Sequence, residues 1–392
     1  MKHVRTFAAL GLFALQVLLP ANCLGDEPAR PGIRALAFSP DGKALAAVTG
    51  EPNQPGSAVV WDLATRAKRW THAEPTGIPA VAFAPDGQRL AIGLYSGAAK
   101  LLDSATGREL AALRHPKEVR AVAFSPDGKR LATACWDRQL RIWDLSTNTE
   151  MVKCAGHVDR IFTVAYSPDG SLLLSAGGSD GAKLWDAATG VEKRTWKHGN
   201  SFYMPYAQFT PDGQWALTAG YDGTARLWNV TSGELRAKFK GFGGVSRVAF
   251  SQAGNALAVG GLGGSVSLYD LKLSQPDKVE QDRIRSLVAK WDDPSYDARE
   301  AATKELRQIG LVGEPELRRL ITESPSAEVR IRARRLRQDL LKQPRLELAG
   351  DADEVEGLAF SPDGALLATA GKEGIVRLFD VRTGKESARL AP

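Results

Sequence analysis

With 392 residues, the chain is too long for one ordinary compact core, and it suits either two domains or one large repeat architecture. A hydrophobic content of 43% excludes a disordered chain, and 39 glycines with 21 prolines indicate many tight turns. The formal net charge is +6, and it becomes +4 without residues 1–25, which leaves 49 basic against 45 acidic residues. This charge is too small to indicate nucleic-acid binding.

The N-terminal segment has the pattern of an export signal. A basic start precedes an apolar run from Phe7 to Leu19, which is followed by small residues and then by acidic ones. The run is shorter than the roughly 20 residues of a membrane-spanning helix. We therefore predict that residues 1–25 are a signal peptide, cleaved near Gly25, and that the protein is extracytoplasmic, either periplasmic or secreted. Two alternatives stay open: an uncleaved anchor, and lipidation of Cys23, where Asn22 departs from the lipobox pattern. Membrane contact is expected only in these two cases.

A four-residue unit, Ser-Pro-Asp-Gly in its commonest form, repeats through the rest of the chain. These residue types are typical of a hairpin turn in which Gly takes the left-handed conformation, so the aspartates are predicted to be turn formers. The copies, at spacings of 45, 41, 42, 43, 41 and 110 residues, begin at Ser39, Ala84, Ser125, Ser167, Thr210, Ser251 and Ser361. The copy at Ser251 keeps only the Gly of the turn, so we expect a looser sixth hairpin.

Each unit lies between two apolar strands, and a third strand ends on a large apolar residue followed by Asp or Asn. In the third repeat, for example, the third strand ends on Trp143-Asp144, and a short turn then leads to a fourth strand. Four short antiparallel strands in each repeat of about 42 residues are the signature of a β-propeller blade. The sequence therefore predicts an all-β, seven-bladed β-propeller.

The repeats resemble those of the WD-repeat (WD40-type) family, over roughly residues 33–271 and 345–390. In that family a His, a Ser or Thr, an Asp and a Trp form a buried chain of hydrogen bonds. The resemblance implies such a tetrad, at the family spacing, in blade three: His115, Thr133, Asp137 and Trp143. It implies shifted sets in two further blades: His157, Ser175, Asp180 and Trp185 in blade four, and His198, Thr218, Asp222 and Trp228 in blade five.

The order of the strands in the chain predicts how the ring closes. The chain leads directly into a first strand, IRALAF, and finishes on a fourth strand, ESARL. We therefore expect each blade to be contiguous, without the strand exchange that many members of the family show. The contact between blades seven and one would then consist of side-chain packing alone.

Residues 272–343 lose the alternation of strands and gain the periodicity of helices. The predicted helical faces are Ile284, Leu287, Val288 and Trp291, then Ala302, Leu306 and Ile309, then Val329, Ala333, Leu336 and Leu340. We expect four helices, which resemble HEAT-like hairpins that accompany WD repeats in some secreted bacterial proteins. The missing fourth strand of blade six reappears after them, so this small all-α module is predicted to be an insertion between strands three and four of blade six. The propeller then comprises residues 33–271 and 344–392, and the helices share a face with the turns, opposite Trp136.

No motif predicts catalysis, a cofactor or a metal. The histidines recur once per blade near its start, which the repeat explains without a metal. The glycine-rich stretch 260–265 lies between two predicted strands and does not open a helix, as a phosphate-binding loop would. Cys135 is expected to pack on a strand, too far across the blade from Cys154 for a disulfide. The innermost strands look small and apolar, without a convergent set of acids, bases or His, so we predict a non-enzymatic protein.

Aromatic residues give the main indication of function. In WD-repeat proteins the turn between the second and third strands faces the partner-binding surface, and aromatic residues are frequent hot spots of interfaces. The predicted partner-binding residues are Tyr95, Trp136, Tyr221, Phe202 and Tyr203. We predict an exported, monomeric scaffold for an unidentified protein partner. A glycan-binding or small-ligand-binding propeller and a propeller hydrolase or lactonase are the alternatives, and these aromatic side chains could also simply fill the loops against each other.

Overall fold

The structure is a computed structural model that describes residues 31–198, 203–240, 244–271, 278–342, 344–348 and 354–392. Residues 31–392 form one compact unit. The predicted signal peptide, residues 1–25, lies outside the described residues. Within the described ranges, no helix has both the length and the apolar character needed to cross a membrane.

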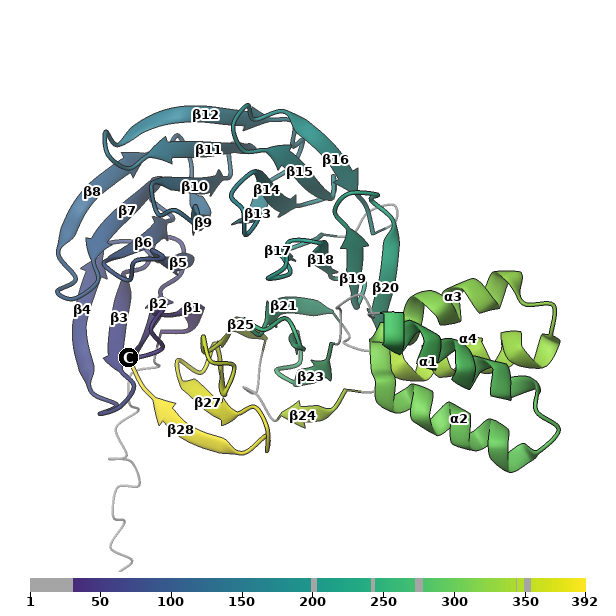
Figure 1. Cartoon of the computed structure of the whole chain (residues 1–392). Helices are drawn as coiled ribbons and strands as arrows, with labels where there is room; N and C mark the ends of the chain where they lie inside the picture. Colours follow the sequence, from purple (N-terminus) through teal and green to yellow (C-terminus); the bar gives the residue numbers. More distant parts are fainter. Residues whose placement is uncertain (1–30, 199–202, 241–243, 272–277, 343, 349–353) are drawn as a thin grey trace, which may run out of the picture. The chain divides into compact units, whose positions relative to one another are not determined.

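Seven four-stranded antiparallel sheets form a ring (Figure 1). Blades one to three are β1 (Ile33–Phe38), β2 (Ala44–Thr49), β3 (Gly56–Asp62) and β4 (Lys68–Glu74); β5 (Ala80–Phe83), β6 (Arg89–Leu94), β7 (Ala98–Asp103) and β8 (Glu109–Arg114); and β9 (Val119–Phe124), β10 (Arg130–Cys135), β11 (Gln139–Asp144) and β12 (Thr149–Ala155). Blades four and five are β13 (Ile161–Tyr166), β14 (Leu172–Gly177), β15 (Ala182–Asp186) and β16 (Glu192–Trp196); and β17 (Tyr206–Phe209), β18 (Trp215–Gly220), β19 (Thr224–Asn229) and β20 (Leu235–Lys240). Blades six and seven are β21 (Val245–Phe250), β22 (Ala256–Gly261), β23 (Val266–Asp270) and β24 (Leu346–Leu348); and β25 (Val355–Phe360), β26 (Leu366–Gly371), β27 (Val376–Asp380) and β28 (Glu386–Leu390). The predicted seven-bladed propeller is confirmed, and the four strands of each sheet follow one another in the chain.

The repeated four-residue units form the turns between the first and second strands. In blade one, Gly42 has a φ of 70°, a conformation that is costly for residues with a Cβ, and its N–H donates to the Ser39 carbonyl at 2.9 Å. The Ser39 hydroxyl donates to the Asp41 carboxylate at 2.6 Å, so the Asp is a turn former, as the sequence indicates. This hydrogen bond holds the pKa of Asp41 below its ordinary value.

The sixth turn keeps this geometry without the Pro-Asp pair. Gly254 has a φ of 67°, and its N–H donates to the Ser251 carbonyl at 2.8 Å. The Ser251 hydroxyl donates to the side-chain oxygen of Asn255 at 2.8 Å, so Asn255 takes over the role of the missing Asp. The expectation of a looser sixth hairpin is therefore wrong.

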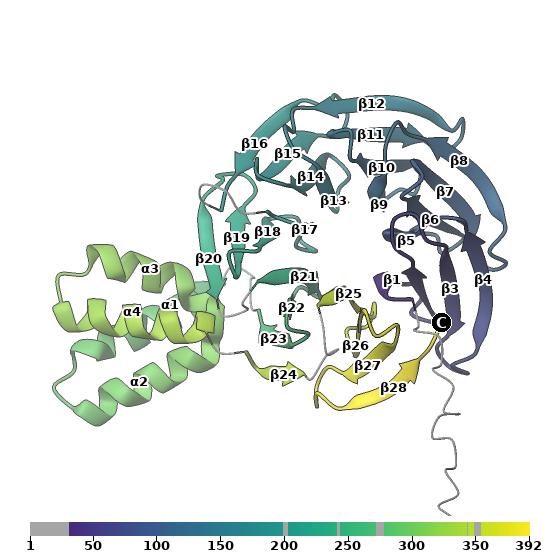
Figure 2. The ribbon, with the colours of Figure 1, turned by 180° about the vertical axis from the view of Figure 1, so that it is seen from behind.

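A small helical insertion follows β23 (Figure 2). It contains α1 (Lys278–Ala289), α2 (Tyr296–Ile309), α3 (Glu314–Glu323) and α4 (Ala327–Lys342), with short 3-10 turns at Lys290–Asp292 and Gly310–Gly313. The predicted apolar faces form one buried cluster, with Trp291 fully buried at its centre and Leu340 partly buried at its edge. After the helices, the chain continues as β24, whose Leu348 lies opposite Val266 of β23.

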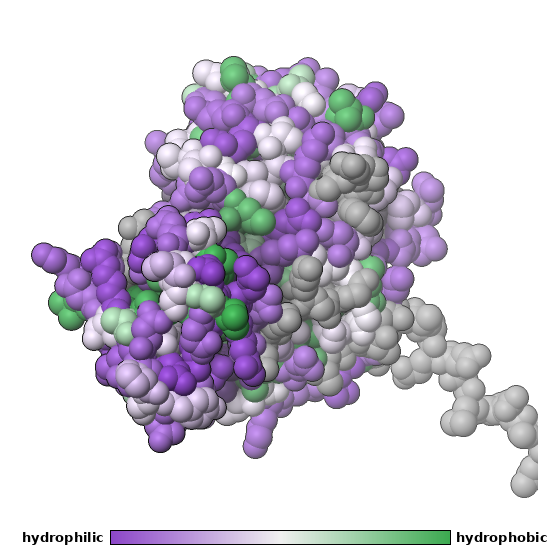
Figure 3. Space-filling view, turned by 90° about the vertical axis from the view of Figure 1, so that its right-hand side faces the viewer, coloured by the Kyte–Doolittle hydropathy of each residue, from purple (hydrophilic) through white to green (hydrophobic). Residues whose placement is uncertain are grey.

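The helical module packs against the outer edge of blade five. Arg318 donates to the Leu235 carbonyl at 3.3 Å, and Arg337 donates to the Arg236 carbonyl at 3.3 Å, both at the start of β20. Leu340 of α4 contacts the apolar cores of both the module and the neighbouring blades. The side of the molecule that carries the helices is mainly hydrophilic, with scattered hydrophobic side chains (Figure 3).

Blades seven and one close the ring through more than apolar packing. Each blade contributes five buried residues to one hydrophobic cluster. In addition, the guanidinium group of Arg34 in blade one forms an ion pair with Glu356 of blade seven, and Arg66 donates to the Ser387 carbonyl at 3.4 Å. The expectation that this contact consists of side-chain packing alone is therefore wrong, because charged groups at the start of the inner strands also join the two blades.

Candidate functional site

Blade four contains a complete chain of four hydrogen-bonded side chains, of which Trp185, Ser175 and His157 are buried. The indole N–H of Trp185 donates to the Ser175 hydroxyl oxygen at 2.8 Å, and that hydroxyl lies 2.7 Å from Nε2 of His157. Nδ1 of His157 lies 2.8 Å from the Asp180 carboxylate. Because a carboxylate only accepts, Nδ1 carries the proton, and Nε2 accepts the hydroxyl proton of Ser175. The chain ties the loop before the blade to its second and third strands.

Blade five repeats the arrangement. The indole N–H of Trp228 donates to Thr218 at 2.8 Å, and the Thr218 hydroxyl donates to Nε2 of His198 at 2.6 Å. Nδ1 of His198 lies 3.3 Å from the Asp222 carboxylate. Asp222 also accepts a hydrogen bond from Arg226 at 2.8 Å. The contact between His198 and the Asp222 carboxylate is therefore longer and weaker than the equivalent contact in blade four.

Blade three differs at its carboxylate. The structure brings His115, Thr133 and Trp143 together: the Thr133 hydroxyl lies 2.8 Å from Nε2 of His115 and accepts the Trp143 indole N–H at 3.0 Å. Nδ1 of His115 instead donates to the Leu113 carbonyl at 3.0 Å. Asp137 binds Arg141 through both carboxylate oxygens, at 2.5 and 3.2 Å. A bidentate, charge-assisted pair is stronger than a bond to neutral imidazole, so Arg141 displaces His115 as the partner of Asp137.

Burial keeps His115 and His198 neutral. It lowers the pKa values of His115 and His198 to about 4, from an ordinary value near 6.5. Both imidazole rings are buried and stand next to the tryptophans of their own blades. A neutral, buried ring whose two nitrogen atoms are already hydrogen-bonded stabilises the fold and offers no free position for catalysis or for a ligand.

Two other groups of potentially reactive side chains are accounted for by their neighbours. His72, Glu74 and Glu109 have the spacing of a metal site, but the ammonium group of Lys100 lies 2.7 Å from Glu74 and 2.9 Å from Glu109 and so supplies the cation. Cys135 and Cys154 are buried free thiols, and burial raises the pKa of each to about 11. A thiol with such a pKa is a poor nucleophile, which agrees with a packing role.

Arg120 organises the aromatic residues on the face opposite the repeated turns. Its guanidinium carbon lies 4.9 Å from the centre of the Tyr95 ring, 5.0 Å from that of Trp136 and 5.9 Å from that of Phe162. Arg160 covers Trp136 at 4.5 Å. Cations over aromatic faces are attracted by the ring quadrupole, so the two arginines hold Trp136 in place. Tyr95 and Trp136 are therefore half-buried parts of a preformed wall.

The remaining predicted partner-binding residues extend this wall. Tyr203 makes an edge contact with Phe162 at 6.2 Å, and 47% of its surface is exposed. Tyr221 is 43% exposed. Phe202 lies outside the residues that the structure describes. The structure thus places Tyr95, Trp136 and Tyr203 in one chain of ring contacts through Arg120 and Phe162, which itself was not among the predicted residues.

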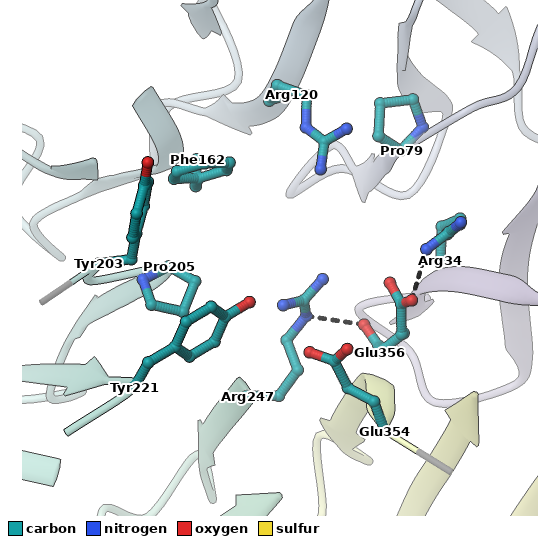
Figure 4. Close-up of a pocket in the computed structure, with 10 residues that line it drawn as sticks. All are labelled: Arg34, Pro79, Arg120, Phe162, Tyr203, Pro205, Tyr221, Arg247, Glu354 and Glu356. Atoms are coloured by element: carbon teal, nitrogen blue, oxygen red, sulfur yellow. Dashed lines mark hydrogen bonds and ion pairs between the residues drawn. The ribbon is translucent and has the colours of Figure 1, made fainter. Parts of the chain in front are cut away.

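A cavity of about 200 Å³ opens near the start of the inner strands, where Phe162, Tyr203 and Tyr221 border it (Figure 4). We call it the channel mouth. Its lining residues are Arg34, Pro79, Arg120, Phe162, Tyr203, Pro205, Tyr221, Arg247, Glu354 and Glu356. They come from blades one, two, three, four, five, six and seven, so the cavity exists only when the ring is closed.

Charged groups of both signs line the channel mouth. Arg34 forms ion pairs with Glu356 and with Glu51. Arg247 donates from Nε to the backbone carbonyl of Glu356 at 2.7 Å and from Nη1 to the Ser246 carbonyl at 2.9 Å. Burial, with a smaller contribution from Glu356, raises the pKa of Glu354. The mouth therefore combines fixed guanidinium groups with a carboxyl group that is less acidic than usual.

The sequence holds an indication of three charged residues of the mouth, Arg34, Arg120 and Glu356, although no motif marks them. Five residues before each four-residue turn unit, at the start of the innermost strand, the seven blades carry Arg34, Pro79, Arg120, Phe162, Pro205, Ser246 and Glu356. The expectation of small, apolar inner strands holds for their central residues and fails at this position. Only alignment of the repeats on their turns, followed by closure of the ring, shows that these side chains meet.

Comparison with known proteins agrees with the observed fold. The family model described as the IFT122 first beta-propeller matches residues 78–292, more than half of the chain, and that of the anaphase-promoting complex subunit 4 WD40 domain matches residues 326–391. Coronin-7 from Bos taurus is 47% identical over 51 residues, which are 13% of this chain and 6% of Coronin-7. The match thus spans a small fraction of that relative.

The family follows from two independent observations. Seven four-stranded blades carry the repeated turn, and three of them carry the Trp, Ser or Thr, and His contacts in their interior. The matched family model covers more than half of the chain. The chain belongs to the family of WD40-type seven-bladed β-propellers.

Proposed function

We propose that the protein is a non-enzymatic scaffold that binds a protein partner at the channel mouth. WD40-type propellers typically mediate protein interactions, which supports the proposal. The observation that carries it is the gathering of Tyr and Arg side chains around one cavity (Figure 4), next to Trp136, which Arg120 contacts. These residue types contribute most of the binding free energy at many protein interfaces.

The rigidity of the aromatic wall supports binding. Arg120 fixes Tyr95, Trp136 and Phe162 relative to one another. Side chains that are already held in place lose little conformational entropy when a partner arrives, so more of the contact energy appears as affinity. The exposed rings of Tyr203 and Tyr221 next to this wall offer apolar surface that a partner would remove from water.

The chemistry of the cavity also favours binding over hydrolysis. Its described lining residues include Arg, Glu and Tyr, but no His, Cys, Ser or Thr. A hydrolase that forms an acyl intermediate on Ser, Thr or Cys needs one of these groups next to a base. The lining instead resembles an interface, in which charged and aromatic groups surround a small depression.

The proposal also includes export and a helical insertion in blade six. Residues 1–25 would act as a cleaved signal peptide, and the mature chain would work outside the cytoplasm as a monomer. The HEAT-like module would be an insertion between the third and fourth strands of blade six, supported by the pairing of β24 with β23 after the helices. N-terminal sequencing of the protein from the extracytoplasmic fraction tests export, and a mature start after Gly25 is the expected result.

Partner capture with matched variants tests the scaffold. We expect Tyr221→Ala to abolish capture of a partner from the extracytoplasmic fraction of the source cell, because it removes an exposed ring at the channel mouth. Tyr296 is the matched control, since it is 63% exposed but lies in α2. Tyr296→Ala should capture as much partner as the unchanged protein.

The same assay separates the proposal from its alternatives. Equal capture by the Tyr221→Ala and Tyr296→Ala variants would contradict binding at the channel mouth. Saturable stabilisation by a sugar in a thermal-shift panel, lost in Tyr221→Ala, would instead identify a glycan-binding propeller. Both variants must melt within a few degrees of the unchanged protein, so that a loss of capture reports a loss of binding and not unfolding.

A further inference from the structure

Three guanidinium groups converge on the channel mouth, and they differ in how they are neutralised. Arg34 has two carboxylate partners, Glu51 and Glu356. Among the described residues, no carboxylate lies within ion-pair distance of Arg120 or Arg247. Figure 4 shows both of these guanidinium groups pointing into the cavity from opposite sides. Two arginines of the mouth thus face the cavity without a carboxylate partner from the described chain.

Each of the two guanidinium groups is held in position by groups that do not neutralise it. Aromatic rings hold Arg120, from 4.9 to 5.9 Å away. Backbone carbonyls hold Arg247, at 2.7 and 2.9 Å from Nε and Nη1. A guanidinium group has five N–H donors in a rigid fork, so Arg247 keeps donors beyond these two bonds. Both arginines are therefore preorganised for a further acceptor.

The arrangement has an electrostatic cost that a ligand of opposite charge would remove. Burial is the main cause that lowers the pKa of Arg120, and the positive charges of Arg247 and Arg34 lower it further. Like charges brought together in a partly buried cavity destabilise the protein that holds them. A fold that keeps two such arginines at its mouth is suited to binding an anion there.

The count of charges indicates the kind of anion. Three arginines and two glutamates line the cavity, which gives a net charge of one positive when all are ionised. This charge matches one carboxylate better than a doubly charged phosphate, which Glu354 and Glu356 would repel. The planar fork of Arg also fits a carboxylate through two parallel hydrogen bonds. A cavity of about 200 Å³ holds several groups of the size of a water molecule, which occupies about 30 Å³.

We propose that the channel mouth binds the carboxylate of an acidic side chain, with Arg120 and Arg247 as its binding residues. Where the acidic side chain belongs to a protein partner, this inference rests on the proposed function. The carboxylate lies between the two guanidinium groups, and the methylene stem of the acidic side chain packs against Phe162 and Tyr221. Glu356 remains paired with Arg34, and Glu354 opposes the ligand and limits its charge.

Small probes with one variable group test this recognition on the full-length protein. N-acetyl-glutamate amide, N-acetyl-glutamine amide, N-acetyl-arginine amide and inorganic phosphate are titrated at millimolar concentrations, and binding is followed by ligand-observed NMR. We expect saturable binding of the glutamate probe, no binding of its neutral glutamine analogue, and weaker binding of phosphate. Arg120→Met and Arg247→Met should each lower the affinity for the glutamate probe by about tenfold or more, because each removes a charge-assisted hydrogen-bond donor.

Two further variants make the result interpretable. Arg130→Met is the matched control, because Arg130 lies over the ring of Tyr166 at 5.7 Å in the same way but does not line the channel mouth. It should bind the glutamate probe like the unchanged protein. Glu354→Gln should strengthen binding of the glutamate probe, since it removes a like charge. If the Arg120→Met variant does not fold, two other variants serve as the test. Arg120→Lys retains the positive charge, and Arg247→Met leaves the aromatic wall intact.

The outcomes separate this inference from the proposed function. Binding of the arginine probe, lost in Glu354→Gln, would overturn the inference in favour of a cationic ligand, and tighter binding of phosphate than of glutamate would overturn its carboxylate specificity. No binding of any probe would also overturn it, even if partner capture still depends on Tyr221. Binding of the glutamate probe that depends on Arg120 would support the inference, even if no protein partner is captured.

Discussion

At one end of the propeller, the seven turns between the first and second strands are nearly identical, and the Gly of each has a φ between 67° and 72°. At the other end, the seven blades place different residues at the same position of the inner strand, so Arg34, Phe162 and Glu356 occupy equivalent sites. At the turn end, the same left-handed backbone conformation of Gly is thus required at seven equivalent positions. The channel mouth instead assembles a single site from seven blades that carry five different residue types at this position.

This difference separates residues that maintain the fold from residues that can recognise a ligand. Repeated positions, such as the turn Gly or the Thr of the buried network, solve a local problem of backbone or hydrogen bonding. Positions that break the repeat without a local reason are free to serve binding. Substitutions at repeated positions should therefore lower stability and leave binding intact, whereas those at the mouth should do the reverse.

The largest expected effect on stability is that of pH on the buried histidines. The pKa values of His115 and His198 are about 4 in the folded protein, below the ordinary value near 6.5 of the unfolded chain. Their contribution to stability is therefore complete above pH 6.5, and it is lost as the pH falls toward 4, where the unfolded chain binds protons that the folded protein does not. We expect a loss on the order of 3 kcal/mol for each His, measured by urea denaturation at pH 7, 5.5 and 4.

The double variant His115→Gln/His198→Gln is the control for this pH dependence. Its free energy of unfolding should be lower at pH 7 and should change less between pH 7 and pH 4. The turn carboxylates act in a more acidic range, because a hydrogen bond from Ser39 holds the pKa of Asp41 below its ordinary value. A free energy of unfolding that stays constant from pH 7 to pH 4.5 would contradict the assignment of neutral, buried rings.

The next largest effect on stability is expected from a comparison of equivalent Thr residues in blades five and seven. Thr218→Val removes the partner of the Trp228 indole and of His198, and we expect a loss of about 2 to 4 kcal/mol, because two buried polar groups lose their hydrogen bonds. Thr369→Val is the matched change, since the fully buried hydroxyl of Thr369 has no hydrogen-bond partner among the described residues. It should be neutral or stabilising in chemical denaturation. Equal losses in the two variants would show that the network does not stabilise blade five.

A smaller effect is expected at the repeated turns. Gly128→Ala should cost about 1 to 2 kcal/mol, because Gly128 has a φ of 67°, while the nearest atoms lie 3.6 Å from an added Cβ and leave room for it. The cost is then one of backbone conformation alone. Gly263→Ala is the control, since its Cβ would meet nothing within 4 Å, and its stability in the same assay should stay within about 0.5 kcal/mol.

The smallest effect on stability is expected at the channel mouth itself. Tyr221 is 43% exposed, so Tyr221→Ala should change the free energy of unfolding by less than about 1 kcal/mol while abolishing partner capture. Chemical denaturation and capture measured on the same preparation give both values. A loss of stability similar to that of Thr218→Val would assign Tyr221 to the fold and remove the contrast between the two ends.

The sequence predicts the local features well and the assembled ones poorly. The turns, the four strands of each blade and the helical faces follow from contacts between near neighbours in the chain, and all of them are seen. The arginines of the channel mouth were not predicted as binding residues, because they come together only when the seven blades close into a ring. Asp137 was expected on His115, yet it binds Arg141, since a bidentate pair with a guanidinium group outcompetes a bond to a neutral ring.

The most direct test of the account compares the two ends of one blade. Ser179→Cys and Ser171→Cys place a thiol at exposed positions of blade four, at the channel-mouth end and at the turn end respectively, while Cys135 and Cys154 stay buried. Each variant is coupled to a maleimide-polyethylene glycol, and partner capture is measured before and after coupling. If the partner binds the channel mouth, coupling at position 179 abolishes capture and coupling at position 171 leaves it unchanged. Loss of capture only after coupling at position 171 would contradict the account, because the partner would then bind the repeated turns.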